Sequence, residues 1–574
     1  MNYLARTALC LCAGIALSAP SAATAARKAK ELLQYIPADT PYVMAITKPM
    51  PEELQERFEP AVDNMLAAYR RILRLHLDDE LARLSAQEGG EEEAARLASF
   101  AEEVLALMSV EALRNAGFDR DTLLAVYGDG LLPVVRLALS DIDAFSATLA
   151  RLEEKSSEHF STGEVAGKAY RYRDFGELRL VIATAGKDAV LTAVPTNYSD
   201  KRLANALGFE KPRRSLAKTK ELRAIAREYD FTDHLVGFVD VERIVAALTG
   251  DPGGANAELF QFAGYDASGI TPLCREEFAA VAQIAPRMVV GYAEVNSNYL
   301  DTQMIIEFRD DIAAGLSTLA AVVPGLGTDP GGLFSIGFSL DPMALRNFVE
   351  ARLDAMEADP YACPALAELQ ASTAAGREAL QKPIPPMVYG FQGFLASITD
   401  IKGLDFASAT PPEAIDGGVV LAMENIETLI SSAAMMNPEV AAVNLLPDGK
   451  ARLLDVPQLA ELAEQAYAAL SVGALAIGIG TGGDKVAETM LVAEPGASRP
   501  VFTTSVDARR YYELIAKAVM EGEPEEDGEP MPLEMREALR DTITASAEMY
   551  DRMTVNVHLT ERGVEIGNRI KLAK

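Results

Sequence analysis

Histidine is scarce in this sequence, and its scarcity argues against a simple metal site. The four histidines, His76, His159, His234 and His558, lie far apart in a chain of 574 residues. A zinc site built on one helix needs two histidines at close helical spacing, and no pair here has that spacing. The sequence therefore predicts no metal-ligating residue.

Motifs for nucleotide binding or hydrolysis are also missing. The glycine-rich segment Gly478–Gly483 lacks the lysine and the Ser/Thr of a phosphate-binding loop, and Lys485–Ala493 is typical of the return strand of a hairpin. No Gly-x-Ser-x-Gly elbow occurs, and Gly332–Gly337 is better explained as a buried strand with small residues. A Ser-His-Asp site assembled in space stays open. The sequence thus offers no catalytic or cofactor-binding residue and favours a non-enzymatic protein.

The first 25 residues have the composition of an export signal. Arg6 supplies positive charge, the segment from Thr7 to Ala19 is almost wholly apolar, and small residues end the segment at Ala25. This apolar run is shorter than the roughly 20 residues of a membrane-spanning helix. Cys12 follows Leu11 and not a small residue, which argues against a lipid anchor. We expect removal of residues 1–25 and a periplasmic mature chain without a transmembrane segment.

Cysteine is nearly absent from the expected mature chain. Of the four cysteines, Cys10 and Cys12 belong to the signal, which leaves Cys274 and Cys363. An exported protein matures in a compartment that permits oxidation, so we predict a disulfide between them. The alternative, a reactive thiol, would need a nearby histidine and a lowered pKa.

Basic residues are too few to balance the acidic ones. The chain has 84 Asp and Glu against 53 Lys and Arg, for a net charge of −31, which becomes −32 when Arg6 leaves with the signal. Nucleic acid and anionic membrane surfaces would both repel such a protein. We therefore expect neither as a partner.

One segment, residues 211–220, is rich in Lys and Arg although the chain as a whole is acidic. A possible anion-binding patch consists of Lys211, Arg213, Arg214, Lys218 and Lys220. The alternative is a solvent-facing loop and helix start, in which nearby acidic residues such as Glu210, Glu221 and Glu228 balance the charge.

Similar landmarks recur in the two halves of the chain. A turn, a strand and a proline near Pro37 match those near Pro324. Three further matches pair Tyr127 with Tyr389, Asp240 with Asp507 and Arg287 with Arg552, at separations of 262, 267 and 265 residues. Because these landmarks occur in one order, we interpret the chain as two diverged copies of one module.

The expected module is α+β. Short alternating runs separated by glycine-containing turns predict mainly antiparallel strands and hairpins, and apolar residues at helical spacing from Ile142 to Leu152 predict an amphipathic helix on the sheet. We place the first module at residues 26–312, a linker at 313–323 and the second module at 324–574.

The opening segment Ile36–Pro41, the strand after it and the Tyr127-Gly128 strand resemble uncharacterised exported bacterial proteins that share a domain of unknown function. In those proteins a short Pro-Ala-Asp segment starts the mature domain. The resemblance implies an envelope location and no particular activity.

Two classes of function fit these observations. The first is a non-enzymatic periplasmic or envelope protein that binds an unknown partner protein or an apolar ligand, in a groove between two modules. The second is a secreted hydrolase with a spatially assembled site. An apolar pocket would favour the first, whereas a histidine within hydrogen-bond reach of both a carboxylate and a serine would favour the second.

The export signal gives the first testable prediction. Intact mass spectrometry of the protein purified from the periplasm should give a chain that starts at Ala26, because the small residues before it fit a signal peptidase. A mass that still includes residues 1–25 would contradict this and support a membrane-anchored chain.

Overall fold

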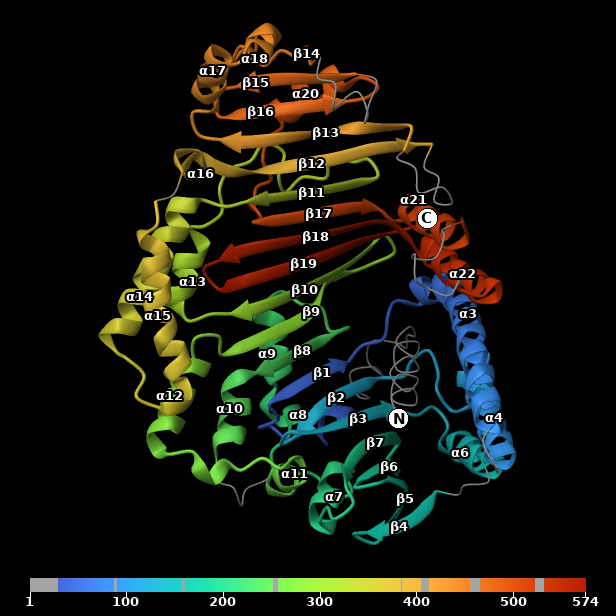
Figure 1. Ribbon diagram of the computed structural model, residues 1–574. Coiled ribbons are helices and arrows are strands. Elements are labelled where there is room, and N and C mark those ends of the chain that lie inside the picture. Colours follow the sequence, from blue (N-terminus) through green and yellow to red (C-terminus); the bar gives the residue numbers. More distant parts are fainter. Residues whose placement is uncertain are drawn as a thin grey trace.

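A computed structural model describes residues 29–86, 90–156, 160–250, 256–383, 385–403, 412–454, 465–521 and 531–574. The expected signal peptide and His159 lie outside these residues. The fold is mixed α+β, as expected, and its strands form one antiparallel sheet of 19 strands (Figure 1). In the part of the chain described, no helix is both long and apolar enough to cross a membrane.

Residues before 310 form one half of this sheet. Each strand pairs antiparallel with its neighbours. In spatial order the strands are β4 (Ser161–Val165), β5 (Lys168–Phe175), β6 (Leu178–Ala185), β7 (Asp188–Pro195), β3 (Leu132–Ala138), β2 (Leu124–Asp129), β1 (Tyr42–Ile46), β8 (Val236–Asp240), β9 (Arg287–Val295) and β10 (Tyr299–Glu307).

Residues after 330 form the other half, and β10 pairs with β19 to join the two. The order continues as β19 (Gly563–Leu572), β18 (Tyr550–Thr560), β17 (Phe502–Asp507), β11 (Phe334–Ser339), β12 (Phe391–Lys402), β13 (Ala414–Met423), β16 (Ala474–Ile479), β15 (Ala466–Ser471) and β14 (Arg452–Leu454). The pairing around β1, which lies between β2 and β8, recurs around β11, which lies between β12 and β17.

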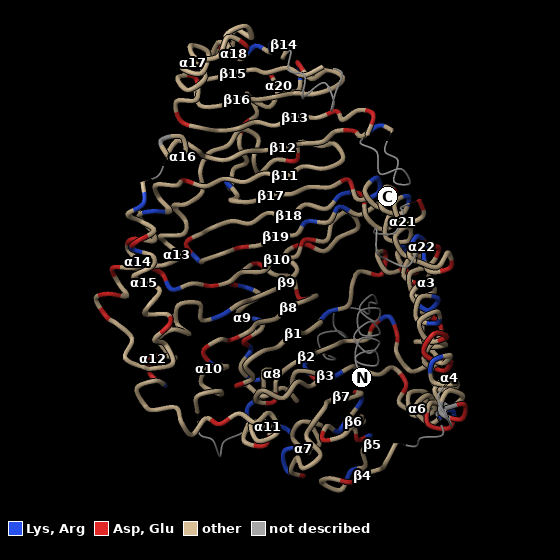
Figure 2. Tube along the Cα trace, in the orientation of Figure 1, with Lys and Arg blue, Asp and Glu red and all other residues tan. Residues whose placement is uncertain are grey.

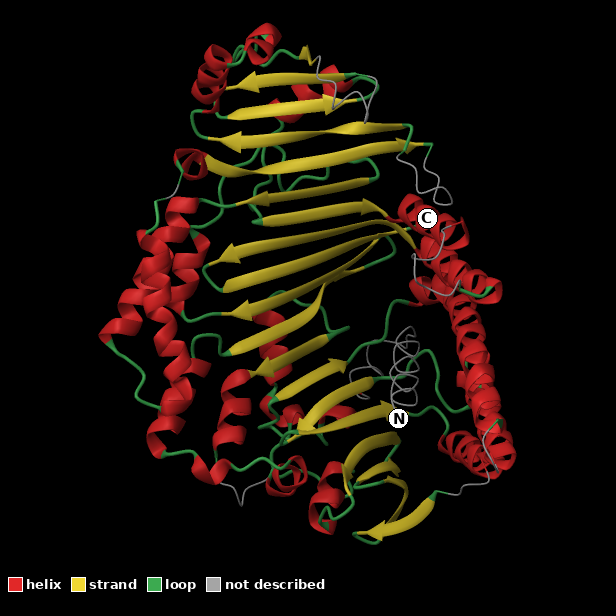
Figure 3. Cartoon of the chain, in the orientation of Figure 1, coloured by secondary structure: helices red, strands yellow, loops and turns green. Residues whose placement is uncertain are grey.

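Helices gather near the two ends of the strands (Figure 3). Those of the first half are α3 (Glu52–Ser85), α4 (Gly90–Ala106), α5 (Val110–Asn115), α6 (Ile142–Ser156), α7 (Asp200–Ala206), α8 (Leu216–Thr219), α9 (Glu221–Glu228), α10 (Val241–Thr249), α11 (Ala257–Ala263), η1 (Ala267–Gly269), α12 (Pro272–Ala282) and α13 (Asp310–Ser317). Those of the second half are α14 (Pro342–Ala358), η2 (Pro364–Leu366), α15 (Ala367–Gln381), α16 (Pro386–Gly390), α17 (Ile426–Met436), α18 (Pro438–Val443), α20 (Gly483–Val492), α21 (Ala508–Glu521) and α22 (Leu533–Met549).

The glycine-rich segment after β16 corrects one expectation. Residues 485–493 were expected to form a return strand, but Gly483–Val492 form helix α20. Gly480 and Gly482 have φ angles of 77° and 74°, which turn the chain into this helix. Gly478 also has no side chain, and a Cβ there would lie 1.9 Å from the Gly483 carbonyl oxygen. The glycines therefore serve a close strand-to-helix turn.

The largest core lies under the first half of the sheet. Val43, Phe238 and Val289 point from β1, β8 and β9 into this core, where they meet Leu222 and Ile225 of α9. Helix α9 has its apolar residues on one face, so its packing removes them from water. The fully buried Arg136 lies in this half and forms an ion pair with Asp188 at 3.0 Å.

The predicted disulfide is confirmed: Cys274 and Cys363 are bonded. Cys274 lies in α12, and Cys363 precedes η2 in the connection between α14 and α15. The Glu277 carboxylate of α12 accepts hydrogen bonds from the backbone N–H groups of Ala362 and Cys363, both at 2.8 Å. The bridge therefore ties the α14–α15 hairpin to the first half of the chain.

Removal of the disulfide should destabilise the protein. The disulfide joins residues that are 89 positions apart and so restricts the unfolded chain. Replacement of Cys274 and Cys363 by serine should therefore lower the free energy of unfolding by about 2–4 kcal/mol. Urea unfolding would measure this, with reductant added to both proteins as a control. Reductant should weaken only the wild type, and equal stability of the two oxidised proteins would contradict the prediction.

Asp129 should make stability depend on pH. Burial, and then the nearby Asp39, raise the pKa of this carboxyl to about 6. A raised folded-state pKa means that stability is lost as pH rises from about 4 to 6, because the buried carboxyl must ionise. Asp129→Asn should therefore stabilise the protein by about 2 kcal/mol at pH 7.5 and by little at pH 4.

Urea unfolding across this pH range would measure the effect of Asp129→Asn, with the exposed Asp79→Asn in α3 as a control. A difference from the wild type that does not change between pH 4 and 7.5 would show that the Asp129 carboxyl ionises normally in the folded protein.

Candidate binding surface

One face of the sheet carries a continuous apolar row. The pairing register places these residues side by side across nine strands: Met44, Gly237, Val290, Met304, Ile566, Val557, Phe502, Phe338 and Phe394. Eight inter-strand steps of roughly 4.8 Å make the row about 38 Å long. We call this side of the sheet the open face.

A second row runs parallel to the first, four residues further along each strand. It consists of Leu300, Ile570, Met553, Val506, Phe334 and Ile398, and all six side chains are half-buried. By the alternation of side chains along a strand, the open-face positions from the first row to the second in β10, β19, β18, β17, β11 and β12 include no charged residue. Charged residues of this parity occur beyond the second row, at Asp551 near the start of β18 and at Asp400 and Lys402 near the end of β12. Figure 2 shows charged residues concentrated on the helices and near the strand ends.

The opposite face of the same strands carries polar side chains, and several of them are more deeply buried than the apolar residues of the open face. Ser335, Ser339, Thr503 and Ser505 are all buried there. The Ser339 hydroxyl donates to the Pro500 carbonyl at 2.9 Å, and the Thr503 hydroxyl donates to the Asn556 side chain at 2.6 Å. These bonds satisfy the buried hydroxyls of Ser339 and Thr503, as burial requires. On β11, Ser335 and Ser339 point to this face, whereas Phe334, Ile336 and Phe338 point to the open face.

The expectation of a fully buried strand at Gly332–Gly337 is thus only half right. The strand exists as β11, but Phe334, Ile336 and Phe338 alternate as half-buried residues with buried small ones. A Cβ on Gly337 would lie 2.4 Å from the Leu326 side chain, because the 319–333 segment passes close beneath the strand. Small residues admit this segment on one face and leave the phenylalanines on the other.

Helices cover the open face at three of its borders. Phe145 of α6 packs in the cluster of Leu124 and Leu137 at the β2–β3 border. Ile426 of α17 packs with Met423 and with the half-buried Leu421 and Leu475 at the β13–β16 border, and Phe58 of α3 packs near Tyr292 and Ile570 at one end of the central strands. Between these borders the row residues remain half-buried, except that Gly237 is buried and Met44 is 43% exposed.

Two histidines of the described chain, His234 and His558, form hydrogen bonds to backbone carbonyl groups through their ring nitrogens. His234 Nδ1 lies 3.2 Å from the Lys48 carbonyl oxygen, and His558 Nδ1 lies 3.0 Å from the Ser498 carbonyl oxygen. Burial, with the nearby positive charge of Lys48, lowers the pKa of His234. Within the described ranges, no three His, Cys, Asp or Glu side chains are placed to hold a metal ion.

The structure does not bring the five cations of the predicted anion-binding patch together: three of them line two separate hollows, and Lys211 and Lys218 line neither. Arg213 and Arg214 line one with Arg243, whereas Lys220 lines another. The Lys211 amino group donates to the Gln34 side chain at 3.0 Å, and the Lys218 amino group donates to the Arg213 carbonyl at 2.9 Å.

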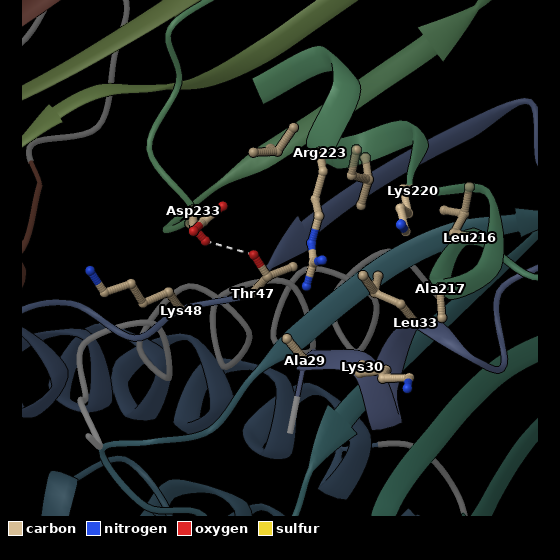
Figure 4. Close-up of a pocket in the computed structure, with 12 residues that line it drawn as sticks. Ala29, Lys30, Leu33, Thr47, Lys48, Leu216, Ala217, Lys220, Arg223 and Asp233 are labelled. Atoms are coloured by element: carbon tan, nitrogen blue, oxygen red, sulfur yellow. Dashed lines mark hydrogen bonds between the residues drawn. The ribbon is translucent and has the colours of Figure 1, made fainter. Parts of the chain in front are cut away.

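The hollow beside Lys220 has a volume of about 340 Å³ (Figure 4). Lys30, Lys48 and Arg223 also line it, and sequence reasoning missed all three. They belong to segments far apart in the chain, so no local charge cluster marked them.

The groove expected between two modules also takes a different form. The two halves meet edge to edge through β10 and β19, so the apolar surface crosses from one half to the other on a continuous sheet.

No protein-family model matches this chain, and comparison with curated proteins and with solved structures finds no match.

Proposed function

We propose that this protein is a non-enzymatic envelope protein that binds a ligand with a hydrocarbon part on its open face. The observation that carries the proposal is the apolar row from Met44 to Phe394, which crosses nine strands without a charged side chain. Most of its side chains are half-buried and so keep part of their apolar area in water, and a contiguous apolar surface of this kind marks a binding surface. Covering it would gain roughly 25 cal/mol for each Å² of apolar area removed from water.

A small polar group within the apolar surface refines the kind of ligand. Tyr292, Thr302 and Asn568 stand side by side on β9, β10 and β19. They offer two hydroxyls and an amide, and none of them carries a charge. A lipid-like molecule, with long apolar parts and an uncharged hydrogen-bonding part, matches this pattern better than a polypeptide, which would bring unpaired backbone groups onto an apolar floor.

The expected location agrees with such a role. Export by residues 1–25 would place the protein in the periplasm, where a carrier of apolar molecules must keep them from water. The net charge of −32 expected for the mature chain, which is −31 without Arg6, would keep the carrier itself from adhering to an anionic membrane surface. No observation on the described histidines favours the hydrolase alternative, so we propose no catalytic residue.

We also propose that the two halves arose by duplication of one module. The pairing order around β1 and β11 supports this, and so do the two hairpins, β9–β10 and β18–β19, that meet at the centre of the sheet. Duplication would extend one apolar surface across two modules. Each module would then supply part of the floor for one long ligand.

A charge placed on the open face should abolish binding. Val557→Glu at the centre of the row should weaken binding of a neutral apolar dye, such as N-phenylnaphthylamine, at least tenfold, since the dye would lie beside an ionised carboxylate. Fluorescence titration of the mature protein would measure this. Val472→Glu is the matched control, because Val472 is 79% exposed and lies at the β15–β16 turn outside the row.

Equal dye affinity in Val557→Glu, Val472→Glu and the wild type would contradict the proposal, provided that circular dichroism shows all three folded. Native mass spectrometry of the wild type from the periplasm identifies the occupant. A bound lipid would support the proposal. A bound polypeptide would contradict it and show that the open face binds a partner protein.

A further inference from the structure

We propose that the hollow between the 29–33 segment, the end of β1 and the α8–α9 junction is a second binding site, specific for an anionic group. It is distinct from the open face and does not depend on the function proposed there. The hollow is lined by four cations, Lys30, Lys48, Lys220 and Arg223, in a chain whose net charge is −31.

Three separate segments bring these cations together. Lys30 comes from residues 29–33, Lys48 follows β1, and Lys220 and Arg223 come from the α8–α9 junction. In Figure 4 the Arg223 guanidinium extends into the middle of the hollow, with Lys30 and Lys220 toward one side and Lys48 at the other. The fold thus gathers charges that the sequence keeps far apart.

These cations differ from most of their neighbours in having no carboxylate partner. Nearby arginines are paired, such as Arg243 with Glu221 at 2.7 Å and Arg287 with Glu307 at 2.6 Å. Within the described residues, none of the four lining cations forms an ion pair, and Asp233 is the single acidic residue of the lining. Four positive charges around one hollow repel one another, and a bound anion would relieve that repulsion.

Backbone contacts hold this arrangement in place. The Thr47 hydroxyl donates to the Asp233 carbonyl at 2.6 Å, and the Nδ1 atom of the buried His234 ring donates to the Lys48 carbonyl at 3.2 Å. These contacts fix the segment after β1 against the segment before β8. Lys220 has a φ angle of 60°, a left-handed conformation that lysine adopts only at a cost in stability. The strain falls on a residue that lines the hollow.

The lining also defines the class of ligand. Leu33, Leu216, Leu222 and Val236 supply an apolar wall beside the cations. The volume of about 340 Å³ is at the lower end of the range for small-molecule sites. A phosphate or carboxylate with a short apolar substituent fits both the charge and the wall. The phosphate could belong to a free small molecule or to a lipid headgroup, which share this chemistry.

Isothermal titration calorimetry of the mature protein tests the site with inorganic phosphate and octyl phosphate as probes. The double variant Lys30→Gln/Arg223→Gln should raise the Kd for octyl phosphate at least tenfold. The control Lys211→Gln/Lys218→Gln makes the same charge change outside the hollow and should change the Kd less than threefold. Saturable binding of inorganic phosphate as tight as that of octyl phosphate would assign the site to a free anion, and tighter binding of octyl phosphate would assign it to an amphipathic one.

Absence of saturable binding of both probes to the wild type would overturn the proposal, and so would equal weakening by the two double variants. Lys220→Gly gives an independent test, because glycine adopts a φ of 60° without strain. It should raise the thermal midpoint and yet weaken octyl phosphate binding. If Lys220 were only structural, this variant would leave the Kd unchanged.

Discussion

Nine residue pairs between β10 and β19 join the two halves of the chain, and the extended surface of the protein depends on this pairing. Each of these strands is the last of its half, and without the other it would present a row of unpaired backbone N–H and C=O groups to water. Pairing satisfies both edges at once. It also aligns Met304 with Ile566, so the apolar row passes from one half of the chain to the other without a break.

The chemistry of the two faces explains why the row stays open. Beneath β11, the small residues Ser335, Gly337 and Ser339 leave room for the 319–333 segment, and the Ser339 hydroxyl donates to the Pro500 carbonyl. The large apolar side chains of β11, Phe334, Ile336 and Phe338, alternate with these small residues and point the other way. Helices α6, α17 and α3 then cover only the borders of the sheet, since each is anchored at the strand ends. A long apolar floor remains.

Parts of this architecture could be read from the sequence with good physical reason. The expected export would leave only Cys274 and Cys363, and an oxidising compartment would favour a bond between two such cysteines; the structure contains this bond. Alternating residues from Phe334 to Ser339 predict a strand, because side chains alternate between the two faces of a sheet. The helix from Ile142 was also visible from its apolar spacing, and it forms as α6. The segment after Gly480 was misjudged, since glycines permit both a hairpin turn and a helix entry.

The sequence by itself determined the acidic charge, the pair of cysteines and local elements such as β11 and α6, because these depend on neighbouring residues or on simple composition. Only the tertiary structure decided which face of the sheet is covered, because the alternation of β11 is the same whichever side meets the 319–333 segment. It also decided that Lys30, Lys48 and Arg223 share a hollow with Lys220, since proximity between distant segments arises from strand order and packing. Candidate sites of this kind are products of the fold, and the sequence holds their residues without showing that they meet.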